Sequence, residues 1–228
     1  MTVIKRLSLV DQVYEKIRER IVFLEIPFGS KLNVSKLQEE YGVSSTPVRE
    51  ALNRLRNDGL IEIENNVGAR VIDFTEDDVR QVQELSYAYQ IVAARNAMRN
   101  GDIHEMTEEI GRYIEEYRHS TNVVESCRCI KSILNVFYEN ANNDRLLAKV
   151  TSLNSMDDIL HNLFSIPREK GGSGGQYHSG IIYFEQIQEA VANRDFAKIC
   201  DALEDHQMWS REYILKNLET VKRDANHT

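Results

Sequence analysis

Apolar residues recur with helical spacing over the first quarter of the chain. Between residues 9 and 24 they stand three or four positions apart, as on one face of a helix: Val10, Val13, Tyr14, Ile17, Ile21 and Leu24. Shorter runs of the same kind predict helices over residues 34–41 and 45–57, separated by a turn at Gly42. Pro47 fits the first turn of the later helix, where a missing N–H costs little.

After Gly59 the period changes from 3.6 residues to two. Ile61 and Ile63 alternate with glutamates, and residues 70–72 form a second extended run. The intervening residues 65–68, Asn-Asn-Val-Gly, tolerate positive φ angles. These features predict a small β-hairpin.

From Thr75 onward the pattern is almost wholly helical. It predicts about six helices in an antiparallel bundle, near residues 75–99, 104–120, 123–141, 144–165, 177–193 and 195–221. We therefore expect a mainly α protein of two domains, residues 1–73 and 74–228. The glycine-rich stretch 171–175 lacks the Lys-Ser/Thr ending of a phosphate-binding loop, and no nucleotide site is assigned to it.

Two short helices joined by a glycine turn and followed by a hairpin are typical of a winged helix-turn-helix. The apolar side chains of the helix at residues 45–57 share one face, while its other face is polar: Ser45, Thr46, Arg49 and Asn53. Hydrogen-bonding side chains at the start of such a helix can read base edges in the major groove. The same pattern also fits a packed helical pair with a polar outside, so residues alone leave both interpretations open.

Charge is distributed unevenly along the chain. The net charge is −8 in total, with a balance of +1 over residues 1–72 and −9 over residues 73–228. A near-neutral DNA-binding domain beside an acidic domain is compatible with specific DNA binding if its cations gather on one surface.

The sequence carries no sign of a membrane span, a disulfide framework or an enzyme. No run approaches the length of a transmembrane helix, and no signal-peptide core follows Lys5 and Arg6. The cysteines at positions 127, 129 and 200 are expected to be reduced core residues rather than metal ligands. No nucleophile elbow, HExxH helix or paired carboxylate site is found. We expect a cytoplasmic protein that is not an enzyme and carries no cofactor.

The N-terminal segment from Val10 to Ile72 resembles the GntR family of bacterial regulators. The matching core is Gly42-Val43-Ser44, Thr46-Pro47-Val48-Arg49-Glu50-Ala51-Leu52, Leu55, Gly59-Leu60-Ile61, and Gly68 in the wing. The resemblance implies that the positions of Ser44, Thr46 and Arg49 contact operator DNA and that the wing glycine enters the minor groove. With their neighbours, the candidate DNA-binding residues are Lys36, Ser44, Ser45, Thr46, Arg49, Asn53, Arg54, Asn66 and Gly68.

Two positions depart from the family pattern. Ser35 and Ser45 stand where the family commonly has arginine. Loss of two cations should weaken phosphate attraction, although four others could compensate: Lys31, Lys36, Arg54 and Arg70. We hypothesise an operator that differs from the usual family sequence.

The C-terminal part resembles the FadR subfamily, whose helical FCD-type domain binds an effector and forms a dimer. Matching pieces are Glu84-Leu85, Ala93-Ala94-Arg95, residues 140–143 with Leu146-Leu147, Ile187, Ala190-Val191, Asp195, Ala197 and His206. The metal ligands of the metal-binding branch fall on Ile130, Leu134, Gln186 and His206. Because three of these four are poor ligands for zinc-like ions, we predict no bound metal.

The position of the arginine that often meets an acidic effector in this subfamily is Ser86. The candidate effector residues are therefore mostly uncharged: Ser86, Gln90, Ile130, Leu134, Asn135, Tyr138, Gln186 and His206. Such a set suits a neutral or weakly charged molecule, although an acyl chain against the apolar members is also open, as is mutual hydrogen bonding without a ligand. The remaining histidines, at positions 104, 119, 161 and 178, are expected on the surface.

Together these features predict a homodimeric transcription regulator whose binding to double-stranded operator DNA responds to a small metabolite. The resemblance implies that it acts as a repressor. One alternative remains open, in which the bundle only dimerises and takes no effector. An enzyme is not expected, because about 150 helical residues cannot hold the aminotransferase-like domain that some GntR relatives carry.

Overall fold

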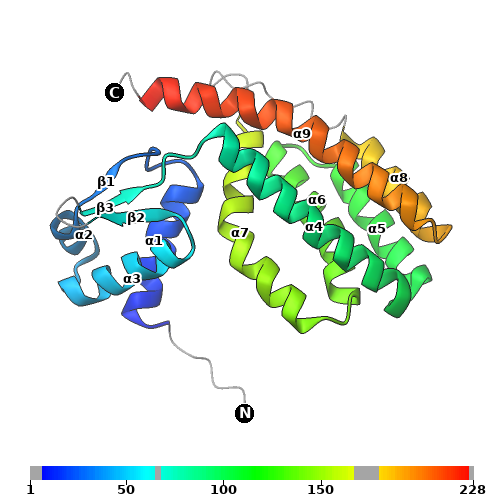
Figure 1. Cartoon of the computed structure of the whole chain (residues 1–228), viewed down its shortest axis with the longest axis horizontal. Helices are drawn as coiled ribbons and strands as arrows, with labels where there is room; N and C mark the ends of the chain where they lie inside the picture. Colours follow the sequence, from blue (N-terminus) through cyan, green and yellow to red (C-terminus); the bar gives the residue numbers. More distant parts are fainter. Residues whose placement is uncertain (1–6, 65–67, 167–179, 226–228) are drawn as a thin grey trace, which may run out of the picture. The chain divides into compact units, whose positions relative to one another are not determined.

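The computed structural model describes residues 7–64, 68–166 and 180–225 (Figure 1). The chain divides into two compact units. The first is Met1–Thr75 together with Val221–Thr228, and the second is Glu76–Thr220. The domain boundary expected from the sequence lies two residues before this division, and the end of the last helix groups with the first unit. Within the first unit, Lys222 Nζ lies 2.7 Å from a carboxylate oxygen of Asp73.

The first unit consists of short helices and a small sheet. Its elements are α1 (Leu9–Val22), β1 (Lys31–Leu32), α2 (Val34–Tyr41), α3 (Ser45–Asn57), β2 (Ile61–Glu64) and β3 (Gly68–Val71). The strands pair antiparallel in the order β1-β3-β2. Leu32 faces Ala69 across one ladder, and Ile63 faces the same residue across the other. This arrangement is a winged helix-turn-helix, which confirms that part of the predicted fold.

The core of the first unit forms where the helical stripes meet the sheet. Ile17 and Ile21 of α1 are fully buried, as are Leu55 of α3 and Leu60 beside β2. α1 begins at a capping box, in which Ser8 accepts the Asp11 N–H and Asp11 accepts the Ser8 N–H. Such reciprocal capping stabilises the first turn. It fixes the helix against which α3 packs.

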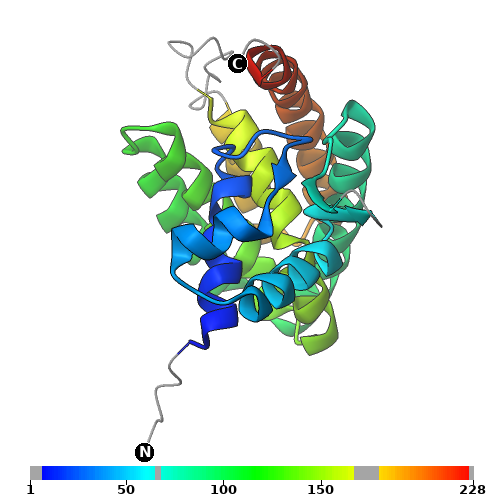
Figure 2. The same cartoon turned by 90° about the vertical axis from the view of Figure 1, so that its left-hand side faces the viewer.

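The second unit is all helical in its described residues. Its helices are α4 (Glu76–Asn100), α5 (Ile103–Arg118), α6 (Val123–Asn140), α7 (Asp144–Phe164), α8 (Ile181–Ala192) and α9 (Phe196–Ala225). α5 packs against α6 and α8, and α4 packs against α6 and α7. The two views in Figures 1 and 2 show these helices running alongside one another. The bundle predicted from the sequence is confirmed.

The apolar interior of the second unit is continuous. It includes Met106, Ile110 and Ile114 from α5 together with Phe137 of α6 and Phe184 of α8. Burial of aromatic and aliphatic side chains of this size is the main force that holds a bundle together. No helix in the described residues is long and apolar enough to cross a membrane. The stretch 171–175 lies outside the described residues.

Two local features differ from the sequence-based expectation. The pattern did not predict β1, because two residues are too few to show a period of two; only pairing with β3 makes them a strand. The first helix ends at Val22, before the predicted end, because Leu24 adopts a positive φ of 61°. A leucine in this region of the backbone interrupts helical geometry.

Candidate functional site

The turn between α2 and α3 is set by one glycine. Gly42 ends α2 with a φ of 64°, a left-handed conformation that L side chains rarely adopt. The N–H of Val43 then donates to the carbonyl of Gln38 at 3.2 Å. Ser44 follows as the N-cap of α3. This turn determines the direction in which α3 leaves α2.

α3 has a fully apolar inner face. Val48, Ala51, Leu52 and Leu55 are all buried, at 3% exposure or less. Their spacing places the side chains between them on the opposite side of the helix. The inner face therefore fixes which residues of α3 point outward.

The outward side of α3 begins with Ser44, Thr46, Arg49 and Asn53, which we call the recognition face. All four side chains are exposed. None of them forms a hydrogen bond or ion pair with another described residue; Ser44 does not cap the helix with its hydroxyl. The first-turn N–H groups of a helix also lack carbonyl partners and can bind an anion. The recognition face therefore offers uncommitted donors and acceptors together with one cation.

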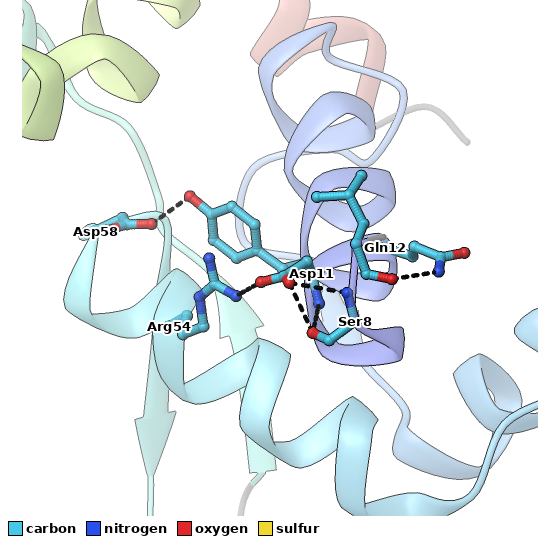
Figure 3. A network of polar contacts seen from close by, with 7 residues as sticks. Ser8, Asp11, Gln12, Arg54 and Asp58 are labelled. Atoms are coloured by element: carbon cyan, nitrogen blue, oxygen red, sulfur yellow. Dashed lines mark hydrogen bonds and ion pairs between the residues drawn. The ribbon is translucent and has the colours of Figure 1, made fainter. Parts of the chain in front are cut away.

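Arg54, which the sequence analysis included among the DNA-binding candidates, is committed elsewhere. Its Nη1 donates to Asp11 Oδ1 at 2.6 Å, and its guanidinium lies 4.3 Å from the centre of the Tyr14 ring (Figure 3). Hydrogen bonds from Ser8 and then from Arg54 lower the pKa of Asp11 to about 2. The Tyr14 hydroxyl donates to Asp58 at 2.5 Å. Arg54 thus joins α3 to α1, and the geometry favours a structural role for it.

The other candidates lie around the recognition face or beyond the described residues. Ser45 is half-buried at the start of α3, and Lys36 is exposed in the first turn of α2. Gly68 begins β3 with a φ of 101°, and no atom lies within 4 Å of where its Cβ would be, so a side chain there would be strained by the backbone alone. Asn66 lies outside the described residues.

The second unit contains a cavity of about 80 Å³, lined by α4, α6, α7 and α9. Its polar lining consists of Gln83, Ser86, Gln90, Asp157, His161 and His206, with Gln207, Ser210 and Cys127 beside them. Its apolar lining consists of Ile130, Leu134, Leu160, Phe164 and Ile214. A space of this size suits a few water molecules or a ligand of a few heavy atoms.

The cavity includes five of the eight effector candidates from the sequence: Ser86, Gln90, Ile130, Leu134 and His206. The other three lie elsewhere in the second unit. Asn135 is exposed on α6, and Tyr138 is buried in the core, outside the lining. Gln186 lines a separate surface depression with Glu189 and other residues of α8 and α9. Asn135 lies outside the lining because it follows Leu134 on α6, and successive side chains of a helix point about 100° apart.

Sequence reasoning missed the contribution of α7. Asp157, His161 and Phe164 all line the cavity, whereas His161 was expected on the surface; that expectation was wrong. The i, i+4 spacing of Asp157 and His161 places both on one helix face, and this was the available signal. His104 and His119 are exposed as expected, and His178 lies outside the described residues.

Hydrogen bonds and burial set the charge of the cavity. Ser86 Oγ donates to Asp157 Oδ1 at 2.6 Å, and His161 Nδ1 donates to the Asp157 carbonyl at 2.6 Å. Burial raises the pKa of Asp157 to about 6 and lowers the pKa values of His161 and His206 to about 4. At neutral pH the lining therefore carries one carboxylate and two neutral imidazoles. Among the described residues, no group of three or more His, Cys, Asp or Glu side chains could hold a metal ion.

The chain resembles known bacterial regulators. Residues 9–71 match the family described as "Bacterial regulatory proteins, gntR family". The chain is 28% identical over 150 residues to the uncharacterized HTH-type transcriptional regulator BphR of Paraburkholderia xenovorans, covering 65% of this chain and 59% of BphR. It is 31% identical over 105 residues to the probable D-xylose utilization operon transcriptional repressor of Paenarthrobacter nicotinovorans, covering 46% of each chain.

Solved structures extend the likeness in fold over nearly the whole chain. E. coli McbR/YncC matches with a TM-score of 0.66 at 16% identity, covering 89% of this chain and 95% of that one. A regulator of Pseudomonas syringae pv. tomato matches with a TM-score of 0.55 at 20% identity, covering 96% and 89%. The proteins that the chain resembles are transcription regulators and not enzymes.

Proposed function

We propose that this chain is a DNA-binding transcription regulator of the GntR family that recognises double-stranded operator DNA through α3. The observation that carries the proposal is the recognition face on a winged helix-turn-helix. Its polar side chains are exposed and have no partners among the described residues. These side chains are therefore available to hydrogen-bond with a binding partner. The base edges and phosphates of DNA carry donors and acceptors that complement them.

Different residues of the first unit are proposed to contact the bases, the phosphates and the minor groove. Arg49 is suited to a bidentate contact with guanine, and Asn53 to one with adenine. Lys36 is a point charge suited to a phosphate and carries no sequence information. Gly68 at the wing allows close approach of the backbone to the minor groove.

The operator is proposed to differ from the sequence that most of the family binds. Ser35 and Ser45 carry no charge where arginine is common, and Arg54 is held by Asp11. The remaining cations around the recognition face are few. Arg49 is therefore the one cation of the recognition face that is available for a base contact.

Selection of bound sequences from a random DNA library tests both the DNA binding and the operator. We expect enrichment of a two-fold symmetric sequence, because a homodimer presents two copies of α3 to two half-sites. Recovery of the common family operator would show that Ser35 and Ser45 do not change the operator sequence. Absence of any enrichment at low salt, with metabolites removed, would reject the proposal of DNA binding itself.

The cavity in the second unit is proposed as the effector site. Its size favours a small metabolite over an acyl chain, and its polar groups converge from four helices. An effector can shift the DNA affinity only by the difference between its affinities for two arrangements of the dimer. We propose that the ligand favours the arrangement that fits the operator poorly, as in a repressor released by its metabolite.

A screen of metabolites by thermal shift, followed by DNA affinity measurements, tests the effector role. The expected result is a ligand that raises the melting temperature and weakens operator binding. His206→Leu, which removes a lining imidazole, should reduce both effects, whereas His104→Leu at an exposed site should change neither. If ligands bind and DNA affinity never changes, the bundle serves dimerisation only.

A further inference from the structure

The cavity in the second unit contains an acidic group without a basic partner. Asp157 is the one acidic side chain among its lining residues, and neither lysine nor arginine lines it. Lys131 lies outside the lining and acts on Asp157 through its charge, but its ammonium group pairs with Asp158. Arg211 donates from Nε to Gln83 Oε1 at 2.7 Å. The lining is therefore negative at neutral pH.

Several acceptor atoms of this lining are not used by the described part of the chain. Asp157 receives one hydrogen bond, from Ser86 to Oδ1, which leaves Oδ2 without a donor. His161 uses Nδ1 to donate to a carbonyl, so its neutral ring presents Nε2 as an acceptor. His206 has ring contacts, the nearest to Phe184 at 4.7 Å between centroids, but no hydrogen bond to a described residue.

These free atoms remain open to the cavity. No side-chain atom of Asp157, His161 or His206 is among the fully buried polar atoms that lack a partner in the described residues. Asp157 Oδ2, His161 Nε2 and the ring nitrogen atoms of His206 thus retain contact with open space. Buried polar atoms are normally hydrogen-bonded, so Asp157 Oδ2, His161 Nε2 and the unprotonated nitrogen of His206 can accept hydrogen bonds from a ligand.

We infer that the effector of this cavity is a small organic cation, a primary amine of a few heavy atoms, whose ammonium group donates to Asp157 and to the neighbouring histidines. This inference rests on the proposed role of the cavity as the effector site. An ammonium group carries three donors and no acceptor, which matches a lining of free acceptors. Phe164, the aromatic ring among the lining residues, provides a further attractive surface for a cation.

Other ligand classes fit the lining less well. An organic acid would meet the carboxylate of Asp157 with no lysine or arginine in the lining to pair with it. An uncharged alcohol of equal size could enter but would gain nothing from the charge of Asp157. The described residues offer no three-ligand group for a metal ion.

Calorimetric titration of the full chain at pH 7.5 with n-butylamine, 1-butanol and propionate separates these classes, because the three probes have similar size and different charge. We expect the amine to bind at least about tenfold more tightly than the alcohol, and the acid more weakly than both. Asp157→Asn should reduce amine affinity by about tenfold or more and leave alcohol binding unchanged. Asp144→Asn is the matched control, since it removes an exposed carboxylate from the same helix.

A second measurement needs no variant. The titratable side chains that line the cavity are Cys127 on α6, Asp157 and His161 on α7, and His206 on α9; α4 contributes only uncharged groups. Lowering the pH from 7.5 to 5 protonates Asp157, whose pKa is raised by burial to about 6. The histidines stay neutral over most of this range because burial lowers their pKa values to about 4. Amine affinity should therefore fall with the protonation of Asp157.

Tighter binding of propionate than of butylamine, or no amine binding up to about 10 mM, would overturn the inference. So would full amine affinity in Asp157→Asn with no fall at pH 5. Stoichiometric binding of Zn²⁺ alone that Asp157→Asn abolishes would also overturn it. Failure of the proposed effector role looks different. In that case the amine binds in an Asp157-dependent manner, but operator affinity is the same with and without it.

Discussion

At the scale of single residues, two arginines on the same helix have different surroundings. Arg49 is exposed and has no described partner, whereas Arg54 is held by Asp11 and by the ring of Tyr14. Spacing alone could not separate them, because both follow the polar side of the helix. The difference comes from α1, which reaches one of them and not the other.

Substitution of each arginine should therefore affect a different property. Arg49→Ala is expected to weaken specific operator binding by roughly 1–3 kcal/mol while leaving nonspecific binding less affected. Arg54→Ala should instead lower the free energy of unfolding, by about 1 kcal/mol or less because the ion pair is partly exposed. DNA affinity and urea denaturation of both variants check this. Equal loss of operator affinity in both would mean that Arg54 also contacts DNA.

The buried histidines predict how stability depends on pH. An unfolded histidine takes up a proton as the pH falls through about 6.5, whereas folded His206 stays neutral until about pH 4. Between these values the unfolded state binds more protons, so stability falls as the pH falls. His206→Gln should flatten this dependence by roughly 1–3 kcal/mol between pH 7 and pH 4.5, measured by urea denaturation.

Asp157 acts with the opposite sign in the same experiment. Its folded pKa of about 6 lies above the value of 3.8 for a free carboxyl. The folded state therefore binds more protons between these values, and this contribution to stability is lost as the pH rises through about 6. The wild type gains free energy of unfolding from Asp157 when the pH falls from 7 to about 4. Asp157→Asn should remove this gain in the unligated protein.

At the scale of elements, the recognition face depends on how α2 ends. Gly42 adopts a left-handed backbone conformation, and no atom lies within 4 Å of where its Cβ would be. The requirement for glycine is thus conformational and not a matter of space. The hydrogen bond of Val43 to Gln38 then completes the end of the helix.

Replacement of Gly42 tests this requirement. Gly42→Ala should lower the free energy of unfolding by about 1 kcal/mol, because alanine resists positive φ. Gly42→Asn should cost less, since asparagine tolerates the left-handed region. Chemical denaturation of both variants provides the comparison. If the two substitutions cost the same, a lost contact rather than backbone strain determines the effect.

At the scale of the whole molecule, the charge is divided between the two parts of the chain. The first 72 residues have a balance of +1 and the remainder a balance of −9. Under the proposed function, attraction to DNA comes from a few cations of the first unit, Lys36 among them, and not from the protein as a whole. The counterions released on binding should be correspondingly few.

This distribution predicts the salt dependence of operator binding. Lys36→Ala should reduce the slope of log affinity against log salt concentration by about one for each subunit whose Lys36 contacts a phosphate. It should weaken binding to specific and nonspecific DNA sequences equally. Lys198→Ala, an exposed lysine of α9, is the control and should leave the slope unchanged. If Lys36→Ala leaves the slope unchanged, Lys36 does not contact the DNA.

The sequence by itself determined the kinds of elements and their order. The apolar stripes of α1, α3 and the bundle helices, and the change of period after Gly59, follow from which face each element must bury. Five of the effector candidates chosen from the sequence also line the cavity.

Tertiary structure alone decided which side chains meet. The pairing of β1 with β3, the capture of Arg54 by Asp11, and the entry of Asp157 and His161 into the cavity all join residues far apart in the chain. Local pattern carries no information on such contacts, since they depend on the packing of one helix against another. For the same reason, the charge of the cavity could be read only from the folded chain.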